Sequence, residues 1–122
     1  MSPRTTHSRQ QKRWLLALEP WAQGRGFVGP EWRFWIPAEG GVSGALTPDV
    51  AYVCSERLRA LAPQDEEEPP IAPDIAIEVR SKGDRQADIE WKISRYLESG
   101  AQLVVVDDPQ QRTISAYDPR HD

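Results

Sequence analysis

The feature of the sequence that most limits its fold is a strand, a helix and a second strand in succession between residues 73 and 106. Apolar side chains alternate along 73–79, which predicts a strand with two different faces. Residues 85–99 repeat apolar side chains at helical spacing, and Gly100 is placed to end that helix. The apolar run 102–106 predicts the next strand. A helix between two strands is typical of a crossover in a mixed sheet.

The segments on either side of this unit predict further strands and two more helices. We expect helices over 10–23 and 54–61, strands over 27–36, 47–53 and 112–117, and a solvated acidic loop over 64–70. Ser55 is expected to cap the short helix, and the glycines from Gly40 to Gly44 to close the first strand. The first three strands can form an antiparallel meander. The fold class is therefore α/β (α+β), with a mixed central sheet and flanking helices in one domain over residues 1–122.

The composition is that of a globular protein that does not coat nucleic acid through bulk positive charge. Hydrophobic residues make up 39% and charged residues 28% of the chain, proportions that suit a globular core. A chain of 122 residues is long enough for one such core and too short for two. The formal net charge is −4, whereas proteins that bind nucleic acid by bulk charge are basic. The negative net charge does not argue against carboxylates that ligate a divalent cation, because the bound ion attracts phosphate.

Cysteine and histidine exclude several kinds of site. Cys54 is the only cysteine, so one chain can form neither a disulfide nor a thiolate zinc cage, and we expect a reducing, cytoplasmic setting. No run approaches the ~20 apolar residues of a membrane helix, and no signal-peptide core follows the basic N-terminus, so no membrane association is expected. His7 and His121 lie in flexible-looking sequence near opposite ends, which gives little support to histidine chemistry.

Two carboxylates stand where neighbouring strands would bring them together. Asp49 begins the second predicted strand, and Glu78 lies near the end of the third. In an antiparallel pair the start of one strand lies beside the end of the other, with cross-strand neighbours ~5 Å apart, so both could ligate one Mg²⁺ ion. A Glu buried in an apolar strand needs a cation, a metal or water, and if its face is solvated the need disappears. Both interpretations stay open.

Asp74 and Lys92 are the other charged residues to weigh for this site. Asp74 shares a face with Glu78 but precedes it by four residues, about 13 Å along a strand, which is too far to ligate the same ion. An Asp after Pro is also ordinary turn chemistry at a strand entrance. Lys92 stands beside the apolar stripe of its helix, from which the amine could reach Glu78. The alternative is a surface pair with Asp88.

Motifs spaced along the chain form a linked set. They are Thr47-Pro48-Asp49-Val50, the stretch from Ala72 to Ser81, Asp88, Lys92, Tyr96, Gly100, and Val106-Asp107-Asp108-Pro109. This set resembles the Uma-two family of restriction-endonuclease-like proteins, within the PD-(D/E)XK nuclease superfamily. Ser2-Pro3 and His7 resemble the segment that enters the first core helix of the family, so the resemblance extends over nearly the whole chain.

The resemblance implies a restriction-endonuclease-like α-β-β-β-α-β core that binds a divalent cation, Mg²⁺ or Mn²⁺. Asp49 matches the PD aspartate and Glu78 the (D/E) position. Arg80 stands where many superfamily members carry lysine, and Lys92 matches the lysine that has moved to the helix in this family. Asp74 also matches a family position, which keeps it as a weaker candidate that would support the ligands.

The chain departs from the family pattern in two respects. Family members usually have a strand-rich segment before the position of Ser2-Pro3 and a further segment after that of Asp118, so this chain is short at both ends. Lys82 stands where the family often has Pro, which affects the turn into the helix.

The function expected from the residues and the resemblance is metal-dependent hydrolysis of DNA, or a diverged relative of that activity. Asp49 and Glu78 would hold the ion, and Lys92 would orient water or stabilise the charge on phosphate. Contacts with DNA phosphates would come from Arg80, or from Arg9, Lys12 and Arg13 on the first helix.

The alternative function is a non-catalytic interaction module that keeps the nuclease fold, such as a homodimer. Five Trp in so short a chain favour this alternative, with Trp32 and Trp35 expected on opposite faces of one strand.

Overall fold

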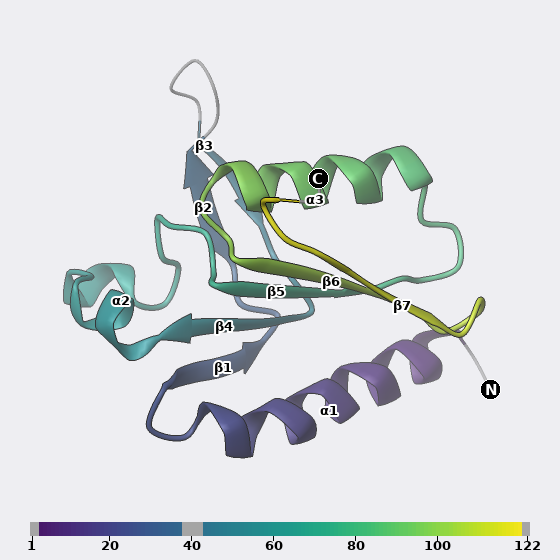
Figure 1. The fold of residues 1–122 in the computed structure, drawn as a ribbon, viewed down its shortest axis with the longest axis horizontal. Helices are drawn as coiled ribbons and strands as arrows, with labels where there is room; N and C mark the ends of the chain where they lie inside the picture. The colour runs from purple at the N-terminus through teal and green to yellow at the C-terminus, as the bar shows by residue number, and fades with distance from the viewer. Residues whose placement is uncertain (1–2, 38–42, 121–122) are drawn as a thin grey trace.

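A computed structural model describes residues 3–37 and 43–120. The helices are α1 (Pro3–Ala22), α2 (Ser55–Arg59) and α3 (Gln86–Glu98), with a 3-10 turn, η2, at Pro63–Asp65. The strands are β1 (Gly26–Pro30), β2 (Phe34–Pro37), β3 (Ser43–Leu46), β4 (Val50–Cys54), β5 (Ile75–Val79), β6 (Leu103–Asp108) and β7 (Thr113–Tyr117). Five strands form one sheet in the order β1-β4-β5-β6-β7, with α1 on one face and α3 on the other, and β2 pairs with β3 in a separate hairpin (Figure 1).

The sheet is mixed, and its topology follows the expected crossover. β4 pairs antiparallel with both β1 and β5, so these three strands form the predicted meander. α3 then carries the chain across so that β6 lies parallel to β5, and β7 returns antiparallel to β6. As a result, the start of β4 and the ends of β5 and β6 meet at one edge of the sheet.

Each face of the sheet has its own apolar core. The core toward α1 contains Val28, Val50, Tyr52, Ile77 and Val105, packed against Trp14, Leu15 and Leu18. The core toward α3 contains Ala51, Val53, Ala76, Val104 and Val106, packed against Ile89, Ile93, Tyr96 and Leu97. The alternation predicted for 73–79 is confirmed, because Ile77 faces α1 whereas Ala76 faces α3. Glu78 therefore lies on the α3 face.

Several local expectations are also confirmed. Residues 50–53 of β4 are buried on both faces, as their unbroken apolar run predicts. The apolar stripe of the predicted helix 85–99 consists of Ile89, Ile93, Tyr96 and Leu97, and these are the buried residues of α3. Gly100 has a φ of 112°, the left-handed conformation that ends a helix. The acidic run is a loop apart from η2, with residues 66–68 exposed.

Among the described helices, no segment combines the length and the apolar character that a membrane span requires.

The first helix begins earlier than predicted, at Pro3 instead of Gln10. Residues 3–9 carry no apolar stripe, so hydrophobic periodicity could not detect them. A polar contact holds this part of α1 to the sheet instead, between His7 Nε2 and Asp49 Oδ1.

The prediction of a single strand over 27–36 is wrong, because its two halves belong to different sheets. Glu31 has a φ of 46°, which breaks an extended chain between β1 and β2. The sequence also missed β3, which contains the expected breaker Gly44, whereas Gly40 and Gly41 lie outside the described residues. Cys54, and not Ser55, occupies the position before α2, and no side chain caps that helix.

Candidate active site

Glu78 is a buried acid at the end of β5, only 6% exposed. The hydroxyl of Tyr96 donates to its Oε2 at 3.0 Å, and the Lys92 Nζ lies 3.6 Å from its Oε1. Burial raises the pKa of Glu78 to about 7; the Asp49 carboxylate also raises it, while Lys92 and Tyr96 lower it. A single ammonium and one hydroxyl therefore do not compensate for the loss of water around this carboxylate.

Asp49 precedes β4 and is fixed by partners from three elements. Its Oδ2 accepts the backbone N–H of Val79 at 2.7 Å, and its Oδ1 lies 3.1 Å from His7 Nε2. Its backbone carbonyl accepts the Gln11 side-chain amide at 2.9 Å and the N–H of Glu31 at 3.1 Å. Burial raises the pKa of Asp49, and the Val79 N–H and His7 oppose that rise.

Asp49, directly before β4, lies beside Glu78 of the neighbouring antiparallel strand β5, as the sequence predicts. Val50 of β4 is opposite Ile77 of β5, so the same register places Asp49 opposite Glu78. The hydrogen bond from the Val79 backbone N–H to Asp49 Oδ2 holds the Asp49 carboxylate beside the end of β5. The two carboxylates are close enough to repel each other, since Asp49 raises the pKa of Glu78.

Lys92 approaches Glu78 from α3. Lys92 and Tyr96 are one helical turn apart, so they reach the same carboxylate from the same helix face. The expected approach of the Lys92 amine to the Glu78 end of the sheet is thereby confirmed, and the alternative of a surface pair with Asp88 is not needed to explain it. The Lys92 side chain is 37% exposed, so its attraction to Glu78 is partly screened by water.

Asp74 lies at the other end of β5, away from these residues. Its Oδ2 accepts the backbone N–H of Cys54 at 2.8 Å and lies 3.1 Å from Arg57 NH1. These contacts tie the entrance of β5 to α2. Asp74 therefore has a structural role that accounts for its position, and it does not join the Asp49 and Glu78 group.

Arg80 directs its guanidinium into the turn before α3. It donates to the Gln86 side chain at 2.7 Å and to the Asp84 carbonyl at 3.1 Å. A contact between Arg80 and phosphate stays a prediction, because these bonds would have to be exchanged for it.

His7 and Asp107 are residues at this edge of the sheet that sequence reasoning did not assign to the site. The expectation that His7 lies in a flexible end is wrong: it is on α1, against Asp49, whereas His121 lies outside the described residues. Asp107 of β6 is 3% exposed, and its Oδ2 accepts Gln10 Nε2 at 3.0 Å and Trp14 Nε1 at 2.8 Å. The signal that could have found these contacts is the i, i+4 spacing of His7 with Gln11 and of Gln10 with Trp14, which puts each pair on one helix face.

The side chains present fit magnesium or manganese better than zinc. In the part of the chain that the structure describes, no three His, Cys, Asp or Glu side chains are grouped to hold a metal. Magnesium does not require such a cage, because it commonly binds one or two carboxylates and keeps water or phosphate oxygens as its other ligands. Asp49 and Glu78 supply two carboxylates whose ionised forms are disfavoured by burial, and a cation would relieve that cost.

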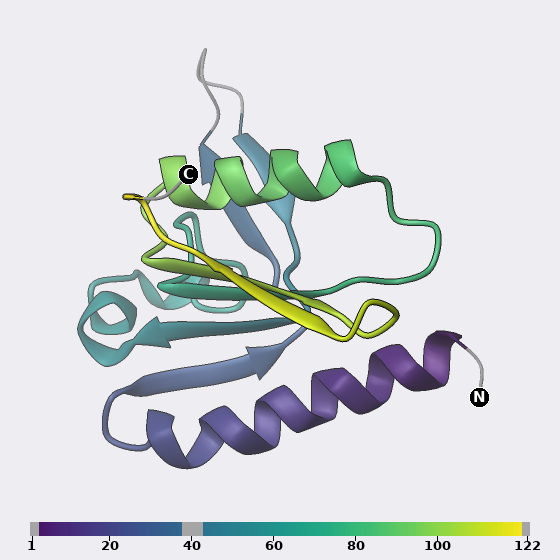
Figure 2. The same ribbon diagram turned by 45° about the vertical axis from the view of Figure 1, so that its right-hand side comes forward.

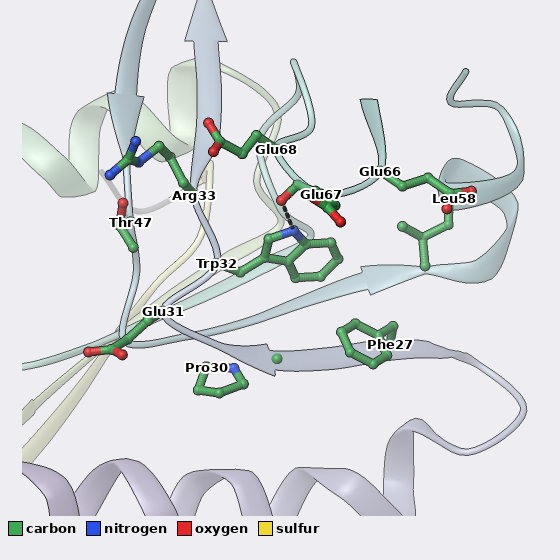
Figure 3. A pocket seen from close by; sticks show the side chains of 11 residues that line it. Phe27, Pro30, Glu31, Trp32, Arg33, Thr47, Leu58, Glu66, Glu67 and Glu68 are labelled. Atoms are coloured by element: carbon green, nitrogen blue, oxygen red, sulfur yellow. Dashed lines mark hydrogen bonds between the residues drawn. The ribbon is translucent and has the colours of Figure 1, made fainter. Parts of the chain in front are cut away.

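A groove of about 770 Å³ lies between β1 and the acidic run 66–68 (Figure 3). Its apolar wall includes Phe27 and Trp32, whose rings meet edge to face at 5.3 Å, and Trp32 Nε1 donates to the Glu67 carbonyl at 3.1 Å. The charged side chains that line it are Glu31, Glu66, Glu67, Glu68 and Arg33. Four carboxylates against one guanidinium give this groove a negative charge, which repels phosphate.

Comparison with known proteins agrees with the fold. The family model described as “Putative restriction endonuclease”, Uma2, matches residues 1–122. Among solved structures, the chain is similar to that of a “putative nuclease belonging to DUF820” from Anabaena variabilis, with a TM-score of 0.80 and 23% identity over 95% of this chain. This chain spans 64% of the length of that protein. No curated protein matches it. Because the family model matches from end to end, the chain belongs to the Uma2 family.

Proposed function

We propose that this protein is a nuclease that hydrolyses phosphodiester bonds in DNA, with Mg²⁺ or Mn²⁺ held by Asp49 and Glu78. The observation that carries the proposal is the buried Glu78, whose pKa is raised to about 7 beside a second carboxylate. Such a group opposes folding when it is ionised. A carboxylate that costs stability is expected where a protein uses its charge, and strongly perturbed acids cluster at functional sites.

The contacts of the described side chains suggest a division of roles. A divalent cation bound there would supply a Lewis acid for the phosphoryl oxygens and a water of lowered pKa. The Val79 N–H fixes the Asp49 carboxylate, and the Tyr96 hydroxyl fixes Oε2 of Glu78. Lys92 would exchange Glu78 for the phosphate and stabilise the negative charge that grows as the phosphodiester bond breaks.

Cleavage of supercoiled plasmid tests this proposal. We expect nicked or linear DNA with Mg²⁺ or Mn²⁺ and none with EDTA. The variants Asp49→Asn and Glu78→Gln should lose the activity, because each removes one charged ligand. Glu19→Gln is the matched control, since Glu19 is an exposed acid on α1. Metal-independent cleavage, or full activity of Glu78→Gln, would refute the assignment.

A second candidate function is the interaction or dimerisation module. The observation that favours it is the 3.6 Å distance between Lys92 Nζ and Glu78 Oε1, because the ammonium already supplies part of the positive charge that a metal ion would provide. Sedimentation of the wild type over a range of concentrations tests for dimers. A dimer with no metal-dependent cleavage and no stabilisation by Mg²⁺ would favour the module.

A further inference from the structure

We infer that a groove between α1 and the β6–β7 turn binds the phosphate backbone of nucleic acid, through Arg9, Arg13 and Arg112. The groove has a volume of about 390 Å³. Its lining residues are Thr6, Arg9, Gln10, Arg13, Asp107, Pro109, Arg112, Thr113 and Ile114. This inference rests on the proposed function only for its choice of DNA as ligand.

The charge of the groove is opposite to that of the chain as a whole. The chain has a net charge of −4, yet three guanidiniums face one carboxylate here. That carboxylate, Asp107, is buried and accepts two hydrogen bonds through Oδ2, from Gln10 and Trp14. Residues 3–18 of α1 also contain no Asp or Glu. The local field therefore attracts an anion with several charges along its length.

The fold sets the positions of the arginines. Arg9 and Arg13 are one turn apart on α1, and Gln10 and Trp14, the residues that follow them, anchor the helix on Asp107. The N-terminal half of α1 lies beside the β6–β7 turn in both views (Figure 2). Arg13 NH1 donates to Gln10 at 2.8 Å, which leaves its other N–H groups for a ligand.

Arg112 enters the groove from the turn, in an uncommon conformation. Its φ is 55°, in the left-handed region where Gly or Asn is less costly. In the described part of the chain, no carboxylate forms an ion pair with Arg9 or Arg112. Two guanidiniums are thus available for phosphate oxygens, to which arginine donates in a bidentate manner.

The groove lies at the same edge of the sheet as the candidate active site. Asp107 of β6 is the register partner of Val79 of β5, which in turn binds Asp49. Neighbouring strands are about 4.8 Å apart, so β6 is about 10 Å from β4. A backbone that runs across the strand ends could therefore place one phosphate at Asp49 and Glu78 and a later one among the arginines.

Binding of a fluorescently labelled DNA duplex in EDTA, followed by anisotropy over a range of salt concentrations, tests the inference without cleavage. For wild type we expect binding that weakens with salt. The triple variant Arg9→Gln, Arg13→Gln, Arg112→Gln should reduce the slope of log K against log salt by about 0.9 for each phosphate that the protein no longer neutralises. Arg33→Gln and Arg59→Gln, at arginines elsewhere on the surface, should leave the slope unchanged. An unchanged slope in the triple variant, or no binding by wild type at low salt, would overturn the inference.

One further variant separates charge from folding. Arg112→Gly relieves the left-handed strain, so it should melt at the same temperature as wild type or higher and still bind DNA more weakly. The two proposals can fail separately. If the wild type binds DNA in EDTA and the triple variant binds it more weakly, but the wild type cleaves no DNA with Mg²⁺, the nuclease proposal fails and the groove stands. If the wild type cleaves DNA and the triple variant binds it equally well, the groove fails and the nuclease proposal stands.

Discussion

The variant Glu78→Gln should change how the stability of the metal-free protein depends on pH. Gln keeps the size of Glu and removes its charge. The pKa of Glu78 is raised from 4.5 to about 7 in the folded state. The folded protein therefore binds a proton on the Glu78 carboxylate more tightly than the unfolded chain does. The corresponding stability is present below pH 4.5 and is lost as the pH rises toward and through 7.

The magnitude follows from the size of the pKa shift. A difference of about 2.5 pH units, at 1.36 kcal/mol each, corresponds to about 3 kcal/mol. No large discount for solvent applies, because the Glu78 side chain is only 8% exposed. In EDTA the free energy of unfolding of the wild type should therefore fall by about 3 kcal/mol between pH 4.5 and pH 8. That of Glu78→Gln should not show this fall. Mg²⁺ should restore stability to the wild type at pH 8 and leave the variant unchanged.

Urea denaturation followed by tryptophan fluorescence, at several pH values with EDTA or Mg²⁺, measures both effects. Glu19→Gln serves as the control for the loss of one exposed negative charge. If the pair with Lys92 instead stabilises the fold, Glu78→Gln should be less stable than wild type at pH 8 by roughly 3–5 kcal/mol. That outcome, with no effect of Mg²⁺ on the wild type, would refute the argument.

Three other substitutions test separate parts of the structure. Lys92→Met should lower plasmid cleavage by on the order of 100-fold with little change in the melting curve, whereas Lys82→Met, on an exposed turn, should cleave normally. Asp74→Asn should cost about 1–2 kcal/mol in urea denaturation and leave the metal dependence of cleavage intact, because it binds Arg57 and not the site. Gly26→Ala should lower the free energy of unfolding by about 3 kcal/mol or prevent folding, since its Cβ would lie 2.2 Å from the Val53 carbonyl oxygen. A melting temperature equal to that of wild type would contradict this packing.

The central part of the fold could be predicted because its signals are local and agree with one another. β5 alternates apolar side chains, α3 repeats its stripe every three or four residues, and Gly100 ends the helix. The antiparallel pairing that brings Asp49 to Glu78 then follows from the order of the strands. The approach of Lys92 also follows, since its place beside the buried stripe of α3 fixes its direction.

The elements that escaped prediction depend on contacts between distant residues. The first turns of α1 have no apolar face, and His7 and Gln11 reach Asp49 more than thirty residues away. The split between β1 and β2 depends on the conformation of Glu31, an exposed residue whose type does not require a left-handed φ. Asp107 belongs to a sequence motif, but only the packing of α1 on β6 shows what it binds.

The central claim is that Asp49 and Glu78 together hold one divalent cation, and titration calorimetry with Mn²⁺ at pH 8 tests it most directly. For the wild type we predict one ion per chain, with binding that weakens as the pH falls through 7 because Glu78 takes up a proton. Glu78→Gln and Asp49→Asn should each lose this binding, and Glu19→Gln should keep it. The absence of binding in the wild type, or equal binding in Glu78→Gln, would contradict the claim.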